Sequence, residues 1–111
     1  MIIDIHGHYT TEPAPLKEFR AAQLRGESPS VQALAAQVSD DAIRESVEQN
    51  QMRVLRERGG DMMLFSPRAA GMEHHVPDAR VATAWAQASN DLVHRVSEAF
   101  PAQFAPVAQL P

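Results

Sequence analysis

The chain has 111 residues, of which 44% are hydrophobic and 22% are charged, so it is long enough for one globular domain at most. It contains no cysteine, which excludes disulfide scaffolds, thiolate zinc fingers and cysteine nucleophiles and leaves His, Asp and Glu as metal ligands. Ten Lys and Arg against 14 Asp and Glu give a net charge of -4 without a basic stripe, so we expect no nucleic-acid partner.

The chain also lacks the signals of membrane proteins. No apolar stretch approaches the roughly 20 residues of a membrane span, and the sequence begins on a strand-like run instead of a charged segment and a signal core. We therefore expect no membrane association and a cytoplasmic location.

The first half of the chain predicts one strand and one helix. Residues 1–5 are rich in β-branched side chains and predict a strand that ends at His6-Gly7-His8. Residues 12–30 are polar and broken by Pro and Gly, so no element is predicted there. Beyond Ser39 or Asp40, which can cap a helix, apolar residues recur at helical spacing until Gly59-Gly60.

The second half repeats this order. Residues 61–65 form a short apolar run before Ser66-Pro67, which predicts a buried strand of a parallel sheet. Residues 78–99 carry apolar side chains on one helical face until Pro101. Residues 104–111 predict a third strand.

Strand, helix, strand, helix and strand in this order predict an α/β fold, the βαβαβ pattern of a parallel sheet with right-handed crossovers. One helix per crossover covers such a sheet poorly and leaves two open edges. A complete (β/α)8 TIM barrel needs roughly 250 residues, so three strands in this length fit the first part of a truncated barrel. We therefore expect residues 1–111 to be the N-terminal segment of a single barrel domain.

The strongest candidate for chemistry is the His6-Gly7-His8 triplet at the end of the first strand. Side chains alternate across a strand, so both imidazoles point to one side and can converge on one ion. Zinc binds imidazole nitrogen, and catalytic zinc keeps one position open, so His6 and His8 would supply half of the usual ligand set. The alternative is a hydrogen-bonded surface pair.

Three further residues are candidates for substrate binding. Arg68, at the end of the second strand, can clamp a carboxylate through paired hydrogen bonds, and the Ser66 hydroxyl can add a third. Arg68 could equally be a solvated loop arginine. Tyr9 could reach a substrate with its hydroxyl or pack over the mouth of a barrel. His74 and His75 point in different directions in any regular conformation, which favours an ordinary loop.

These stretches together resemble the N-terminal third of the metal-dependent amidohydrolase superfamily, in the branch that contains aminocarboxymuconate semialdehyde decarboxylase. The matching stretches are Ile2-Ile3-Asp4-Ile5-His6-Gly7-His8-Tyr9-Thr10, Glu57-Arg58-Gly59-Gly60-Asp61, Leu64-Phe65-Ser66-Pro67-Arg68-Ala69, Trp85-Ala86 and Asn90-Asp91-Leu92. The His-x-His strand end is common to the superfamily, whereas Gly-His-Tyr-Thr and Phe-Ser-Pro-Arg-Ala favour its hydratases.

The resemblance implies a zinc ion, or another divalent metal, held by His6 and His8 together with later residues. It also implies a hydro-lyase that adds water to a carbon–carbon double bond of an unsaturated tricarboxylate from aromatic ring cleavage. Arg68 and Ser66 match the position of a clamp for this small polycarboxylate substrate. The acid and base residues cannot be named from this sequence, and we expect the full-length protein to be a homo-oligomer.

Two alternatives remain open at this point. A metal-dependent decarboxylase or hydrolase of the same superfamily would use a similar metal set. A complete, non-catalytic module could instead bind a partner through the open strand edges, although exposed edges promote aggregation. If the chain is a fragment of the hydro-lyase, we expect it to be inactive alone. We also expect the isolated chain to bind zinc weakly, because two imidazoles cannot close a tetrahedral site.

Overall fold

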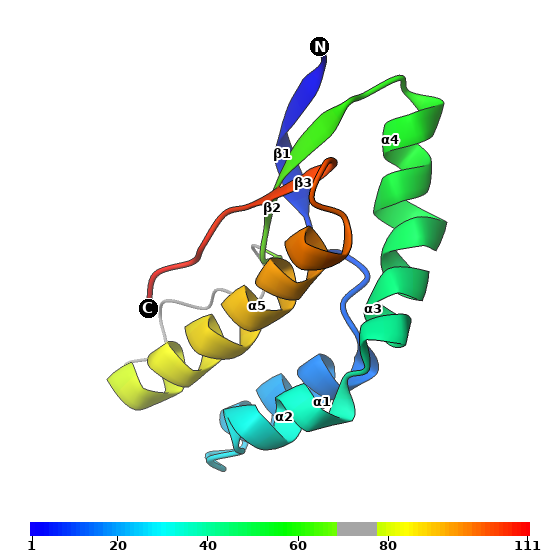
Figure 1. Ribbon diagram of the computed structural model, residues 1–111. Coiled ribbons are helices and arrows are strands. Elements are labelled where there is room, and N and C mark those ends of the chain that lie inside the picture. Colours follow the sequence, from blue (N-terminus) through cyan, green and yellow to red (C-terminus); the bar gives the residue numbers. More distant parts are fainter. Residues whose placement is uncertain (69–77) are drawn as a thin grey trace.

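The computed structural model describes residues 1–68 and 78–111 and places them in a parallel sheet with helices (Figure 1). The strands are β1 (Ile3–His8), β2 (Met62–Ser66) and β3 (Phe104–Pro106). They pair in the order β1-β2-β3, and both pairs are parallel. The predicted α/β class and the parallel arrangement are therefore confirmed for the described residues.

Two strand boundaries differ from the predictions. β1 continues through His8, because its pairing with β2 extends to Ser66 and the Tyr9 amide then donates to the Ser66 carbonyl at 3.0 Å. β3 is shorter than the predicted 104–111 and ends at Pro106, although the Val107 amide still donates to the Phe65 carbonyl at 2.8 Å. The following tail turns to α5 (Ala79–Ala99), where Gln109 exchanges two hydrogen bonds of 2.8 Å with the Asn90 side chain.

The segment 12–30, for which no element was predicted, contains the helix α1 (Ala14–Leu24), and α2 (Val31–Gln37) follows it. The prediction was wrong here because the polar composition concealed a buried face. Leu16, Phe19 and Ala22 lie three residues apart and are all buried. Pro15 is tolerated in the first turn, where a missing amide hydrogen costs nothing.

The helix predicted from Ser39 to Gly59-Gly60 is present but is not uniform. It consists of α3 (Asp40–Val47), a π-helical turn η1 (Glu48–Met52) and α4 (Arg53–Glu57). The Ser39 hydroxyl accepts from the Ala42 amide at 3.1 Å, and Gly59 ends the helix with φ +66°. The buried residues Val47 and Met52 are five positions apart, so the wider turn keeps both in the core.

Helix α5 confirms the predicted helix 78–99. Its N-terminal cap is Asp78, whose carboxylate accepts from the amides of Arg80 and Val81, and this bonding lowers the pKa of Asp78. The helix packs against α1, α2, α3 and β3. No helix in the described ranges is both long and apolar enough to cross a bilayer.

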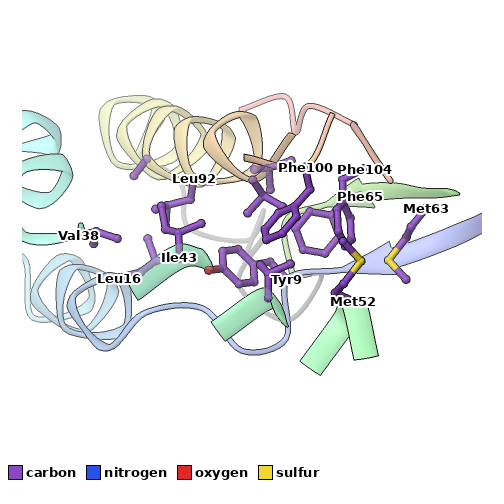
Figure 2. Packing of buried hydrophobic residues seen from close by; sticks show 14 of the residues in the cluster. Tyr9, Leu16, Val38, Ile43, Met52, Met63, Phe65, Leu92, Phe100 and Phe104 are labelled. Carbon is purple, nitrogen blue, oxygen red and sulfur yellow. The ribbon is translucent and has the colours of Figure 1, made fainter. Parts of the chain in front are cut away.

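The core lies between the sheet and the helices and contains a chain of aromatic rings (Figure 2). Phe65 is centred 5.4 Å from Tyr9 and 5.1 Å from Phe104, which in turn lies 5.9 Å from Phe100. Phe65, on the central strand, is fully buried. These contacts fix the C-terminal end of β2 against the end of β1.

Candidate metal centre

The two predicted ligands lie side by side at the C-terminal end of β1. The ring centroids of His6 and His8 are 4.8 Å apart, and the ring planes are nearly perpendicular at 85°. His6 is exposed and His8 is half-buried. The predicted proximity of the rings is therefore present, whereas their role as metal ligands stays a prediction.

The path of β1 to this point is irregular. Asp4 pairs with Met63, but Gly7 pairs with Phe65, so β1 carries one residue more than β2 over the same stretch. This bulge interrupts the strict alternation assumed in the sequence prediction. The Asp4 carboxylate accepts from the His6 amide at 2.9 Å and supports the bulge locally.

Glycine is required between the two histidines. A Cβ atom at Gly7 would overlap the Met63 side chain and would lie 2.8 Å from the Leu64 carbonyl oxygen. The close approach of β1 to β2 therefore depends on the missing side chain. Both histidines are placed by this contact, since they flank it.

The ring of His8 is held by the end of β2. Its Nδ1 atom lies 2.7 Å from the Ser66 hydroxyl oxygen and 3.1 Å from the Pro67 carbonyl oxygen. A carbonyl can only accept, so the contact with Pro67 requires the hydrogen on Nδ1. The lone pair of neutral His8 then lies on Nε2, which is free of these contacts and suited to a metal.

The loop after β1 is held by Gln51 of the π-helical turn, a residue that the sequence analysis missed. The Gln51 amide nitrogen donates to the Thr10 hydroxyl at 3.2 Å and to the His8 carbonyl at 3.4 Å, and its oxygen accepts from Thr11 at 3.1 Å. Gln51 is 8% exposed. A polar residue at a buried position of an amphipathic helix is the signal that could have indicated it.

An open cavity of about 280 Å³ lies beside the pair, between β1 and the helix that contains η1. Its lining includes Asp4, His6, His8, Gln51, Arg53 and Met63. The described residues contain no group of three or more His, Asp or Glu side chains that could hold a metal ion. Two imidazoles with one nitrogen oriented by hydrogen bonding fit half of a zinc site, so further ligands must come from elsewhere.

Of the three predicted substrate residues, the structure brings Ser66 to the His8 ring, whereas Arg68 and Tyr9 do not line the cavity beside the histidines. Arg68 and Tyr9 line a separate, narrow cavity, with room for about one water molecule, between the β2 end and α5. Arg68 is half-exposed, and its Nη1 lies 3.9 Å from a carboxylate oxygen of Glu12. Burial raises the pKa of Glu12, and the positive charge of Arg68 partly opposes that rise.

Tyr9 is placed in the core. It is 2% exposed, and its hydroxyl lies 2.7 Å from the Ser46 hydroxyl, which agrees with the packing alternative, whereas a substrate contact of Tyr9 stays a prediction. The Tyr9 ring packs on Phe65, because the chain turns inward after His8. His74 and His75 lie outside the described residues.

The comparisons with known proteins agree with the hydratase resemblance. The chain is 49% identical to the 2-keto-4-carboxy-3-hexenedioate hydratase of Sphingobium sp. (strain NBRC 103272 / SYK-6), over 100% of this chain and 33% of that protein. The structure of this chain is similar to the crystal structure of the 4-oxalomesaconate hydratase from Rhodopseudomonas palustris, with a TM-score of 0.90 and 42% sequence identity. That match covers 100% of this chain and 33% of the solved chain. No protein-family model matches the sequence.

Proposed function

We propose that this chain forms the N-terminal part of a metal-dependent hydro-lyase with a (β/α)8 barrel, which hydrates an unsaturated polycarboxylate from aromatic ring cleavage. The chain spans about a third of the length of the two hydratases that it resembles, and the resemblance extends over all of it. Three parallel strands with helical crossovers are the share expected from a barrel of eight.

The observation that carries the metal proposal is the arrangement of the two histidines. His8 presents Nε2 because its Nδ1 is engaged by Ser66 and Pro67, and the His6 ring lies beside it. The pair lies at the C-terminal end of a parallel strand, where barrel enzymes place their active sites. When bound there, a divalent ion such as Zn²⁺ would supply positive charge that polarises a substrate oxygen or makes water more acidic.

The part played by this chain in the reaction would be binding and orientation. His6 and His8 would hold the ion, and Gln51 would keep the loop after β1 in place. Arg68 is half-exposed and could bind a substrate carboxylate by a change of rotamer. Within residues 1–68 and 78–111 we assign no acid or base.

The test is a hydration assay on the complete polypeptide that contains this chain. We expect it to consume 4-oxalomesaconate without releasing carbon dioxide, to lose activity on treatment with a chelator and to regain it with Zn²⁺. His8→Ala should lower kcat/KM by at least about 100-fold, since even residues that only support a ligand cost 10-fold to 100-fold.

Other outcomes identify the alternatives. Release of carbon dioxide from a carboxylated muconate substrate would show that the protein is a decarboxylase and not a hydratase. Full hydratase activity of His8→Ala would remove the metal site from the proposal. The exposed His94, which lies 3.7 Å from Glu98 on α5, provides the matched control His94→Ala.

A further inference from the structure

We propose that Ser66 is a positioning residue, whose hydroxyl orients the ring of His8 for metal binding and does not contact the substrate. This inference rests on the proposed metal site. It differs from the role predicted from the sequence, in which Ser66 added a hydrogen bond to a substrate carboxylate. The contacts between the ends of β1 and β2 carry it.

The hydrogen bonds around the Ser66 hydroxyl have one consistent arrangement. The oxygen lies 3.0 Å from the Gly7 carbonyl and 2.7 Å from His8 Nδ1. The carbonyl can only accept, so the single hydroxyl hydrogen is donated to Gly7. The Ser66 oxygen must then accept the Nδ1 hydrogen of His8, which it shares with the Pro67 carbonyl at 3.1 Å.

This arrangement leaves the Ser66 hydroxyl little capacity for a ligand. Its hydrogen is donated to one strand backbone, and its oxygen accepts from the histidine ring. Ser66 and His8 are also direct partners in the parallel register of β1 and β2, so the contact is built into the sheet. When the ring nitrogen of a histidine that does not bind the metal donates its hydrogen to a nearby acceptor, this bond fixes the tautomer and the orientation of the ring.

The two histidines differ in this respect. His6 is exposed, and its ring makes a T-shaped contact with the His8 ring. His8 is half-buried and bonded to two atoms of the β2 end. Ser66 therefore acts on the histidine that the fold already constrains.

The experiment compares Ser66→Ala, Ser66→Thr and wild type in the complete protein. The matched control is Ser97→Ala, because the Ser97 hydroxyl also donates to a backbone carbonyl, that of His94 at 2.6 Å, but on α5. The zinc dissociation constant is measured by competition with a chelator. The tautomer of His8 is read by ¹⁵N NMR on metal-free protein, at a pH about two units above the ordinary imidazole pKa.

We expect Ser66→Ala to weaken zinc binding by about 10-fold, the lower end of the range for supporting residues, because the Pro67 carbonyl still accepts from Nδ1. The population of the tautomer with hydrogen on Nε2 should rise. Ser66→Thr keeps a hydroxyl and should restore both values, and Ser97→Ala should leave both at the wild-type level.

Two results would overturn the inference. One is a Ser66→Ala variant whose zinc affinity and His8 tautomer equal those of the wild type. The other is an increased KM for the substrate at unchanged zinc affinity, which would return Ser66 to substrate binding. If the wild type itself binds no zinc, the proposed function fails, and this result is distinct because the NMR measurement on metal-free protein still reports on the Ser66–His8 contact.

Discussion

The two sides of the sheet differ in how far they are covered. On one side, Met63, Phe65 and Phe104 are at most 6% exposed and pack with residues of the helices. Away from this core, β1 exposes Ile3 by 45% and Ile5 by 78%. The candidate metal centre lies where these two environments meet, since His8 is bonded to the β2 end and His6 is exposed. The lesson is that the core side fixes the geometry while the open side leaves room for ligands.

The strongest test of this comparison is Phe65→Ala. The ring is fully buried and contacts Tyr9 and Phe104, so its removal should lower the free energy of unfolding by about 3–5 kcal/mol. Leu64→Ala is the matched control, because the adjacent residue faces the other way and is half-buried. Equal losses in chemical denaturation would contradict the difference between the two sides.

The next effect concerns the contact between β1 and β2. Gly7→Ala introduces a methyl group against Met63 and should cost about 1–3 kcal/mol, as expected of overpacking. The double variant Gly7→Ala/Met63→Ala tests the cause by a double-mutant cycle. We expect a favourable coupling energy but incomplete recovery, since the Leu64 carbonyl oxygen remains 2.8 Å from the new atom. Strictly additive losses would show that Met63 is not the obstacle.

A smaller effect is expected at Tyr9. Tyr9→Phe removes one hydrogen bond to Ser46, whose own hydroxyl still donates to the Ile43 carbonyl at 2.9 Å, and should cost about 0.5–1.5 kcal/mol. Chemical denaturation of Tyr9→Phe measures this loss, and Ser97→Ala, which removes an exposed hydroxyl, is the control. A neutral result would indicate that the Tyr9 ring alone stabilises the core.

The ionisation of Tyr9 gives a related pH dependence. Burial raises the pKa of this phenol in the folded state above its unfolded value. Its contribution to stability is therefore complete below the unfolded pKa of about 10 and is lost as the pH rises through the folded value. Because Tyr9 is the one tyrosine of the 111 residues, phenolate absorbance of this chain measures it directly. A midpoint at or below the unfolded value would contradict the buried position.

The sequence pattern predicted those parts of the fold that depend on local signals. β1, β2 and α5 follow from β-branched or apolar runs and from an amphipathic period, and Ser39 and Gly59 act as a cap and a stop. Helix α1 was missed because its buried face comprises few apolar residues in a polar segment. The π-helical turn was missed because a five-residue spacing between Val47 and Met52 differs from the helical period.

The candidate site was likewise predictable only where it depends on local sequence signals. The His-x-His spacing at a strand end predicted two neighbouring rings, and the rings are neighbours. The contact of Ser66 with His8 depends on the register between β1 and β2, which no local pattern contains. The same is true of Gln51, which reaches Thr10 and His8 from 41 and 43 residues away in sequence. The residues that support the site, Ser66 and Gln51, could therefore be identified only from the tertiary structure.

The smallest effect is expected on the open side, at Ile5. Its side chain is 78% exposed, so Ile5→Ala in the 111-residue chain should change the free energy of unfolding by no more than about 0.5 kcal/mol. The same substitution in the complete polypeptide sharpens the comparison. A loss of about 2–5 kcal/mol there, the scale of a buried isoleucine, would mean that another segment covers β1, as the proposed barrel requires. A loss below about 0.5 kcal/mol in both the 111-residue chain and the complete polypeptide would show that Ile5 stays exposed to solvent. That result would contradict a barrel closed across this strand.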